Sequence, residues 1–166
     1  FLPSIARALE LSGLEPRWLE LEVTESALLM DTAGALRALG AVKKMGVRLA
    51  IDDFGTGYSS LSYLTELELD CLKIDKCFVG TIGQQAVTSH VIGHIIEMAK
   101  SLGLKMIAEG IETEEQADYL RAHGVQFGQG WLFARPMDMD QLTQALARQQ
   151  ASLHTSSAAV ADNDSV

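Results

Sequence analysis

One pattern recurs along this sequence: a helix-like stretch ends at a glycine, a short apolar run follows, and a polar residue near another glycine closes that run. The three clearest copies are 46–53, 103–110 and 124–130. Glycine ends helices well because it accepts positive φ, and a short β-branched run suits a buried strand. With two further strand-like runs at 18–24 and 70–75, the pattern predicts alternating strands and helices around a parallel sheet.

Five strands and six helices are expected in all. The helices are predicted at 1–11, 31–45, 59–67, 85–102, 114–123 and about 139–150. A complete (β/α)8 barrel needs about 250 residues, so this length fits about five of its eight units. It fits an open doubly wound sheet equally well. Residues 151–166 have no hydrophobic period and are predicted to be a disordered tail after a domain at 1–150.

The composition restricts the partners of this chain. Thirteen Lys and Arg against twenty-two Asp and Glu give a formal net charge of −9, which disfavours DNA or an anionic bilayer as a partner. An anionic ligand would need a cation as intermediary. Without an apolar run of about 18 residues, no membrane insertion is expected, and the segment is predicted to be cytoplasmic, or on the cytoplasmic side of a membrane-anchored parent. Because the chain starts with Phe1 inside a helical pattern, we expect it to begin within a larger protein.

Polar residues stand where the predicted strands end. They are Glu22, Glu25, Asp52, Asp53, Lys73, Asp75, Glu109, Glu112 and Gln129. Parallel strands bring such ends to one edge of a sheet. Two carboxylates about 4 Å apart repel by about 4 kcal/mol at an effective dielectric constant near 20, so the cluster must hold protons or a hard divalent ion such as Mg²⁺ or Mn²⁺. Taken singly, each acid could be a helix cap or a solvated residue, and Asp75 and Glu112 are the best candidates for that role.

Two other motifs give weaker signals. The glycine-rich loop 52–60 has neither the GxGxxG order nor the GK[ST] ending of nucleotide-binding loops. His90 and His94 have the spacing of metal ligands, but no third ligand follows on that helix, so we interpret them as surface residues.

The ordered motifs resemble those of the EAL family of cyclic di-GMP phosphodiesterases, over residues 1–150. The matching stretches are LELEVTES (19–26), IDDFGTGYSSLSYL (51–64), LKIDKCFV (72–79), IAEGIETEEQ (107–116) and GQGWLFARPM (128–137). The resemblance implies a TIM-like barrel in which two Mg²⁺ or Mn²⁺ ions serve the hydrolysis of cyclic di-GMP to linear pGpG.

The resemblance also implies roles for the polar residues. Glu22, Asp52, Asp53 and Glu109 would be metal ligands, with Asp52 bridging the two ions. Lys73 would orient or deprotonate the attacking water, and Glu109 and Glu25 would also be catalytic residues.

The remaining residues have supporting roles. Gln129 and Asp53 would contact the substrate, Glu25 would anchor the loop after Asp53, and Glu112 would be a supporting acid near the ligands.

The family's Glu-Ala-Leu segment and the strand with a metal-binding Asn are expected upstream of Phe1. We therefore expect this chain alone to be inactive, with unpaired strand edges. The resemblance further suggests a homodimer whose interface touches the loop after Asp53, and it allows sensor or diguanylate cyclase-like domains upstream.

Two alternatives stay open. A truncated EAL domain could bind cyclic di-GMP or a protein partner without chemistry. An unrelated barrel hydrolase that uses two carboxylates on sugars would explain the acids but not Lys73.

Overall fold

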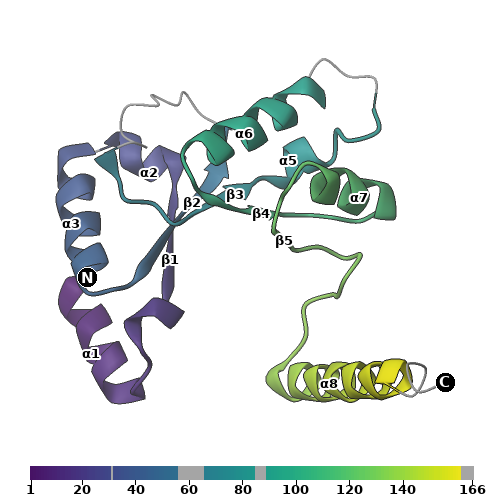
Figure 1. The fold of residues 1–166 in the computed structure, drawn as a ribbon. Helices are drawn as coiled ribbons and strands as arrows, with labels where there is room; N and C mark the ends of the chain where they lie inside the picture. Colours follow the sequence, from purple (N-terminus) through teal and green to yellow (C-terminus); the bar gives the residue numbers. More distant parts are fainter. Residues whose placement is uncertain (31, 56–65, 85–88, 162–166) are drawn as a thin grey trace. The chain divides into compact units, whose positions relative to one another are not determined.

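The computed structural model describes residues 1–30, 32–55, 66–84 and 89–161. In this part of the chain, five parallel strands form one sheet (Figure 1). They are β1 (Glu20–Thr24), β2 (Arg48–Phe54), β3 (Cys71–Ile74), β4 (Lys105–Ala108) and β5 (Phe127–Gly128). Four lie within the predicted runs and β2 ends one residue beyond its run, at Phe54, so the predicted α/β class and parallel sheet are confirmed.

The order of the strands separates the two architectures that the length allowed. Each strand pairs with the next one in the chain, in the order β1-β2-β3-β4-β5. An open doubly wound sheet reverses its direction of growth at a switch point, whereas a barrel adds every strand beside the one before it. The observed order is therefore that of a (β/α) barrel, present here as five strands in the described residues.

The longer predicted helices are present with similar bounds. They are α1 (Leu2–Ser12), α3 (Thr32–Lys44), α6 (Ser89–Ser101), α7 (Glu114–Ala122) and α8 (Met139–Ala161). Three short elements were missed, namely η1 (Pro16–Trp18), α2 (Glu25–Met30) and α5 (Lys76–Val79). The helix predicted at 59–67 falls almost entirely outside the described residues. Helix α8 continues past residue 150 into the stretch predicted to be a tail, while the domain boundary at 150 stays a prediction.

Local signals fix where these elements begin and end. The glycines that precede β2, β4 and β5 all have positive φ: 85° at Gly46, 69° at Gly103 and 79° at Gly124. At the start of α7, Thr113 and Gln116 form a capping box. Asp138 and Gln141 exchange the same pair of hydrogen bonds before α8. The repeated pattern of the sequence is thus a pattern of helix ends and strand beginnings.

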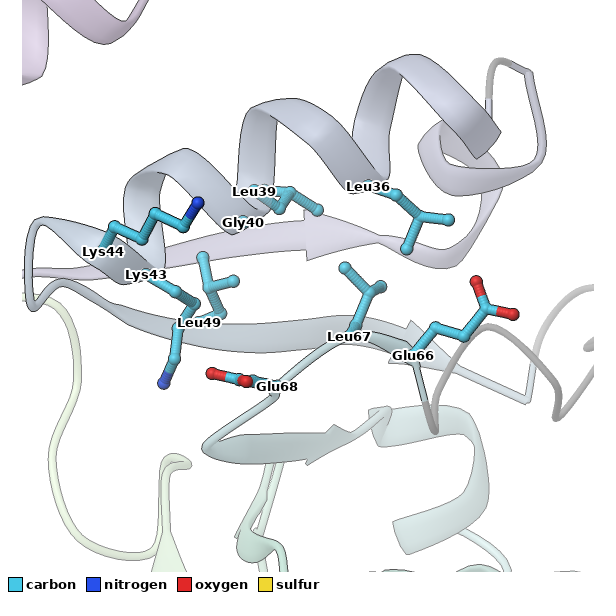
Figure 2. A pocket seen from close by; sticks show the side chains of 9 residues that line it. All are labelled: Leu36, Leu39, Gly40, Lys43, Lys44, Leu49, Glu66, Leu67 and Glu68. Carbon is cyan, nitrogen blue, oxygen red and sulfur yellow. The ribbon is translucent and has the colours of Figure 1, made fainter.

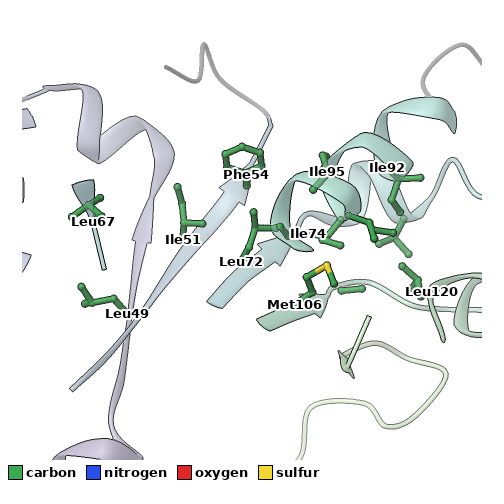
Figure 3. Close-up of a cluster of buried hydrophobic side chains, with 14 of the residues drawn as sticks. Leu49, Ile51, Phe54, Leu67, Leu72, Ile74, Ile92, Ile95, Met106 and Leu120 are labelled. Atoms are coloured by element: carbon green, nitrogen blue, oxygen red, sulfur yellow. The ribbon is translucent and has the colours of Figure 1, made fainter. Parts of the chain in front are cut away.

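One face of the sheet carries the hydrophobic core (Figure 3). Alternate residues of the three central strands, from Leu49 and Ile51 to Leu72, Ile74, Met106 and Ala108, are fully buried. Ile92, Ile95 and Ile96 of α6 belong to the same cluster. Because side chains alternate along a strand, the intervening residues face the other side, and these include Glu22, Asp52 and Lys73.

The chain divides into two compact units, residues 1–133 and 134–166. The first contains the sheet, and the second consists of an extended segment and α8. None of the helices in the described ranges is both long and apolar enough to cross a membrane.

The core gives a prediction about stability. Leu72 on β3 has no exposed surface, so Leu72→Ala leaves a cavity and should lower the free energy of unfolding by about 2–5 kcal/mol. Leu11 on α1 is 76% exposed, and Leu11→Ala should change it by about 0.5 kcal/mol or less. Urea unfolding followed by circular dichroism measures both. Equal effects of the two substitutions would contradict the placement of the core.

Candidate functional site

Lys73, in the middle of β3, lies among three carboxylates that come from three other parts of the chain. Its Nζ is 2.8 Å from Glu22 Oε1, 3.2 Å from Asp52 Oδ1 and 2.7 Å from Glu109 Oε1. The Lys73 side chain is 8% exposed, whereas those of Glu22, Asp52 and Glu109 are 48%, 22% and 23% exposed. We call these four residues the Lys73 cluster. The buried Lys73 ammonium thus pairs with three carboxylates whose side chains remain partly exposed to solvent.

The register of the sheet produces this convergence. Thr24 on β1 pairs with Asp52 on β2, so Glu22 lies two residues back on the same strand face. Glu109 follows β4 directly, and its backbone N–H donates to the carbonyl of Ile74 at the end of β3. The predicted meeting of acids at one edge of the sheet is therefore present for Glu22, Asp52 and Glu109.

Electrostatics keep Lys73 charged. Burial alone would lower the pKa of the Lys73 ammonium, but its hydrogen bonds to Glu109, Glu22 and Asp52 outweigh burial and raise that pKa well above its usual value. These ion pairs thus favour the charged form of Lys73. With three carboxylates around one ammonium, the cluster keeps an excess of negative charge that attracts further cations.

The chain bends sharply at the end of β2. Asp53 has a φ of 54°, a left-handed conformation that is uncommon for residues other than glycine. The pairing of β2 with β3 shifts register between Ile51 and Phe54, and the Asp53 N–H donates to Asp52 Oδ1 at 3.1 Å. Partial burial, followed by the negative charges of Asp52 and Asp75, raises the pKa of Asp53. Asp53 thus lies beside the cluster, in a field that favours a bound cation.

Glu25 supports the segment after Asp53. It begins α2, is 1% exposed, and its Oε2 accepts a hydrogen bond of 3.0 Å from the backbone N–H of Gly55. The contact ties the end of β2 to the end of β1. Residues 56–60 of the glycine-rich loop lie outside the described part of the chain.

Asp75, Glu112 and Gln129 make none of the Lys73 ion pairs that define the cluster, although Asp75 lies close enough to Asp53 to raise its pKa. Asp75 caps α5, since its Oδ1 accepts from the Cys77 N–H at 2.8 Å. The exposed Glu112 makes none of the cluster's ion pairs, and its backbone N–H donates to Gln116 Oε1 in the turn before α7. Gln129 follows β5 with an exposed side chain, and its backbone pairs with Ala108 and Ile111.

The acids have the right chemistry for a divalent ion, although a lysine occupies their centre. Carboxylate oxygens suit Mg²⁺ and Mn²⁺. Among the described residues, no group of three or more His, Cys, Asp or Glu side chains is arranged to hold a metal ion. The three carboxylates point toward the Lys73 ammonium.

One partly buried tether was missed by the sequence reasoning. Asp70 accepts hydrogen bonds from Lys43 Nζ (2.7 and 2.8 Å) and from the Leu49 N–H (2.8 Å). It therefore joins α3 to the beginnings of β2 and β3. No sequence signal marks Asp70, because it stands before a strand whereas the predicted site residues follow one.

A pocket elsewhere in the molecule is unrelated to these acids. It has a volume of about 260 Å³ and lies between α3 and the segment 66–68 (Figure 2). Its lining combines apolar side chains such as Leu39 and Leu67 with Lys43 and Glu68. None of the predicted site residues lines it, so the Lys73 cluster remains the candidate site.

Comparison with known proteins connects this geometry to a family. Residues 1–136 match the EAL domain model. The chain is 48% identical over 124 residues to "Probable cyclic di-GMP phosphodiesterase PdeB" of Escherichia coli, covering 75% of this chain and 23% of PdeB. It spans less than a quarter of the length of that relative.

Solved structures show the same fold. The chain is similar to "PaMucR Phosphodiesterase, c-di-GMP complex", with a TM-score of 0.82, 42% identity, and coverage of 85% of this chain and 57% of that one. It is also similar to a manganese and cy-diGMP complex of Klebsiella pneumoniae BlrP1, with a TM-score of 0.74, 34% identity, and coverage of 81% and 34%. The strand order and the match over residues 1–136 agree, and the chain belongs to the EAL domain family.

Proposed function

We propose that this chain is the C-terminal part of a metal-dependent phosphodiesterase that hydrolyses cyclic di-GMP to linear pGpG. The observation that carries the proposal is the Lys73 cluster: three carboxylates and one ammonium, converging from four strands of an EAL sheet. The names of PdeB and of the PaMucR complex support this substrate. Hydrolysis adds water across one P–O bond of the cyclic dinucleotide, which leaves a 5′-phosphate and a free 3′-hydroxyl.

The cofactor in this proposal is a pair of Mg²⁺ or Mn²⁺ ions. Glu22, Asp52, Asp53 and Glu109 would hold them. When bound, such ions activate water and neutralise charge on the phosphodiester. The manganese complex of BlrP1 supports the choice of metal.

The protein's own residues have complementary roles in this proposal. Of the two roles expected for Lys73, we propose the orienting one, because its Nζ donates to three carboxylates and can donate a hydrogen bond to the attacking water in the same way. Gln129 and Asp53 contact the substrate, and Glu25 holds the loop after Asp53 through its bond to Gly55. Glu112 supports the site only indirectly, through the turn before α7.

The activity belongs to a protein longer than this chain. PdeB is matched over 23% of its length, and the PaMucR structure over 57%. A homodimer that uses the loop after Asp53, sensor or diguanylate cyclase-like domains upstream, and a cytoplasmic location are parts of the same proposal.

The first prediction compares the chain with the full-length protein. In the presence of Mn²⁺ and cyclic di-GMP, we expect pGpG from the full-length protein and none from residues 1–166 alone, because the sheet edges at β1 and β5 need partners. Chromatography of the nucleotides measures both. Equal turnover would refute the inactivity of the chain, and binding by the full-length protein without turnover would favour the non-catalytic module.

The second prediction tests the proposed ligands. In the full-length protein, Glu22→Gln and Asp52→Asn should each reduce kcat by about 100-fold or more, which is about 2.7 kcal/mol of barrier. Matched controls are Glu97→Gln and Asp118→Asn, at exposed residues that pair with Lys100 and Arg121 on their own helices. Folding is checked by circular dichroism. Full activity of either site variant would remove that residue from the ligand set.

The third prediction separates the two roles of Lys73. Arg keeps the positive charge and donates hydrogen bonds but cannot act as a base at neutral pH. If Lys73 orients water and holds the acids, Lys73→Arg should retain more turnover than Lys73→Met. Equal loss in both variants, with folding intact, would instead favour proton transfer by Lys73.

A further inference from the structure

The segment that carries Glu109 is bound on one side by the chain that leaves β5. The Gln129 N–H donates to the Ala108 carbonyl (2.8 Å), the Ile111 N–H donates to the Gln129 carbonyl (3.1 Å), and the Leu132 N–H donates to the Ile111 carbonyl (3.0 Å). These bonds extend the pairing of β4 with β5 beyond Ala108 and Gly128, its last partners in the sheet. The two backbones therefore run together past the point where Glu109 leaves the sheet.

Two glycines allow this close approach. A Cβ on Gly130 would overlap the backbone N, C and O atoms of Ile111. A Cβ on Gly128 would lie 2.6 Å from Ile111 Cδ1 and 3.2 Å from the Phe133 ring. Contacts below 3.0 Å do not occur at real Cβ atoms, so something would have to move. We call Gly128 and Gly130, packed on Ile111, the glycine clamp.

The Glu109 segment is confined on its other side as well. A Cβ on Gly110 would lie 2.5 Å from Lys76 Cβ, at the start of α5. The Glu109 N–H donates to the carbonyl of Ile74, 3.0 Å away, in the strand that also carries Lys73. The segment 109–111 thus fits between α5 and the glycine clamp.

We propose that Gly128 and Gly130 are positioning residues for the phosphodiesterase reaction, which rests on the proposed function above. They fix the distance between the segment with Glu109 and the segment with Gln129. Glu109 pairs with Lys73 at 2.7 Å, and Gln129 stands between the two glycines. Separating the segments would move a proposed metal ligand and a proposed substrate contact together, although neither side chain would have changed.

The experiment uses Gly130→Ala in the full-length protein, with Gly40→Ala as the matched control. Gly40 lies in α3, and a Cβ there meets nothing within 4 Å. We expect Gly130→Ala to lower kcat with Mn²⁺ by about 100-fold, as misplacement of about 1 Å does. KM should rise as well, because the proposed substrate contact Gln129 moves together with Glu109. Gly40→Ala should leave both constants unchanged.

Hydrogen–deuterium exchange gives a readout that does not depend on turnover. Gly130→Ala should increase deuterium uptake in peptides covering 109–112 and 127–133, because the bonds of Ile111 and Gln129 open, and it should leave peptides of α3 unchanged. If the wild-type protein and Gly40→Ala both lack hydrolysis, the proposed function fails, and deuterium uptake alone then tests whether the glycine clamp holds the two segments together. Unchanged uptake at 109–112 and 127–133 would overturn the role of the glycine clamp.

A rescue experiment separates the two glycines and covers the case in which Gly130→Ala does not fold. The overlap in Gly128→Ala is with a side-chain atom, so adding Ile111→Val, which removes Cδ1, should restore turnover and low uptake. The overlap in Gly130→Ala is with backbone atoms, so adding Ile111→Val should not restore the turnover of Gly130→Ala.

Three results would each overturn the proposal. They are a kcat of Gly130→Ala within about threefold of that of Gly40→Ala, restored turnover when Ile111→Val is added to Gly130→Ala, and unchanged turnover in Gly128→Ala.

Discussion

The ion pairs of Lys73 are the interaction on which the site depends. Glu22, Asp52 and Glu109 come from different strands, and at such separations their charges would repel one another. A single ammonium on the strand between them makes their approach favourable. Breaking a buried ion pair leaves an uncompensated charge. Loss of the Lys73 ion pairs would therefore also weaken the pairing of β1, β2, β3 and β4. The chemistry and the sheet therefore stabilise each other.

The side chains of the cluster differ in exposure. Lys73 is nearly buried and fixed by three partners, whereas Glu22 on β1, the first strand of the sheet, keeps almost half of its side chain exposed. The buried cation therefore sets where the three carboxylates stand.

Much of the fold could be predicted because its signals are local. Glycine stops, β-branched runs and the capping box at Thr113 need only neighbouring residues, and all five strands and the long helices were found from them. The short helices α2 and α5 were missed because they have too few residues to show a 3.6-residue period. The Lys73 contacts, the left-handed Asp53 and the fit of Gly130 on Ile111 depend on register and on approaches between distant segments, which a single sequence does not display.

The alternation of side chains across the sheet has a consequence for how such a protein can change. Leu72 and Ile74 belong to the core, and Lys73 between them belongs to the reactive edge. Adjacent positions of a strand are thus constrained separately, one by packing volume and the other by charge. Aliphatic residues at every second position can therefore be exchanged to change the packing while the charged residues on the opposite face stay as they are.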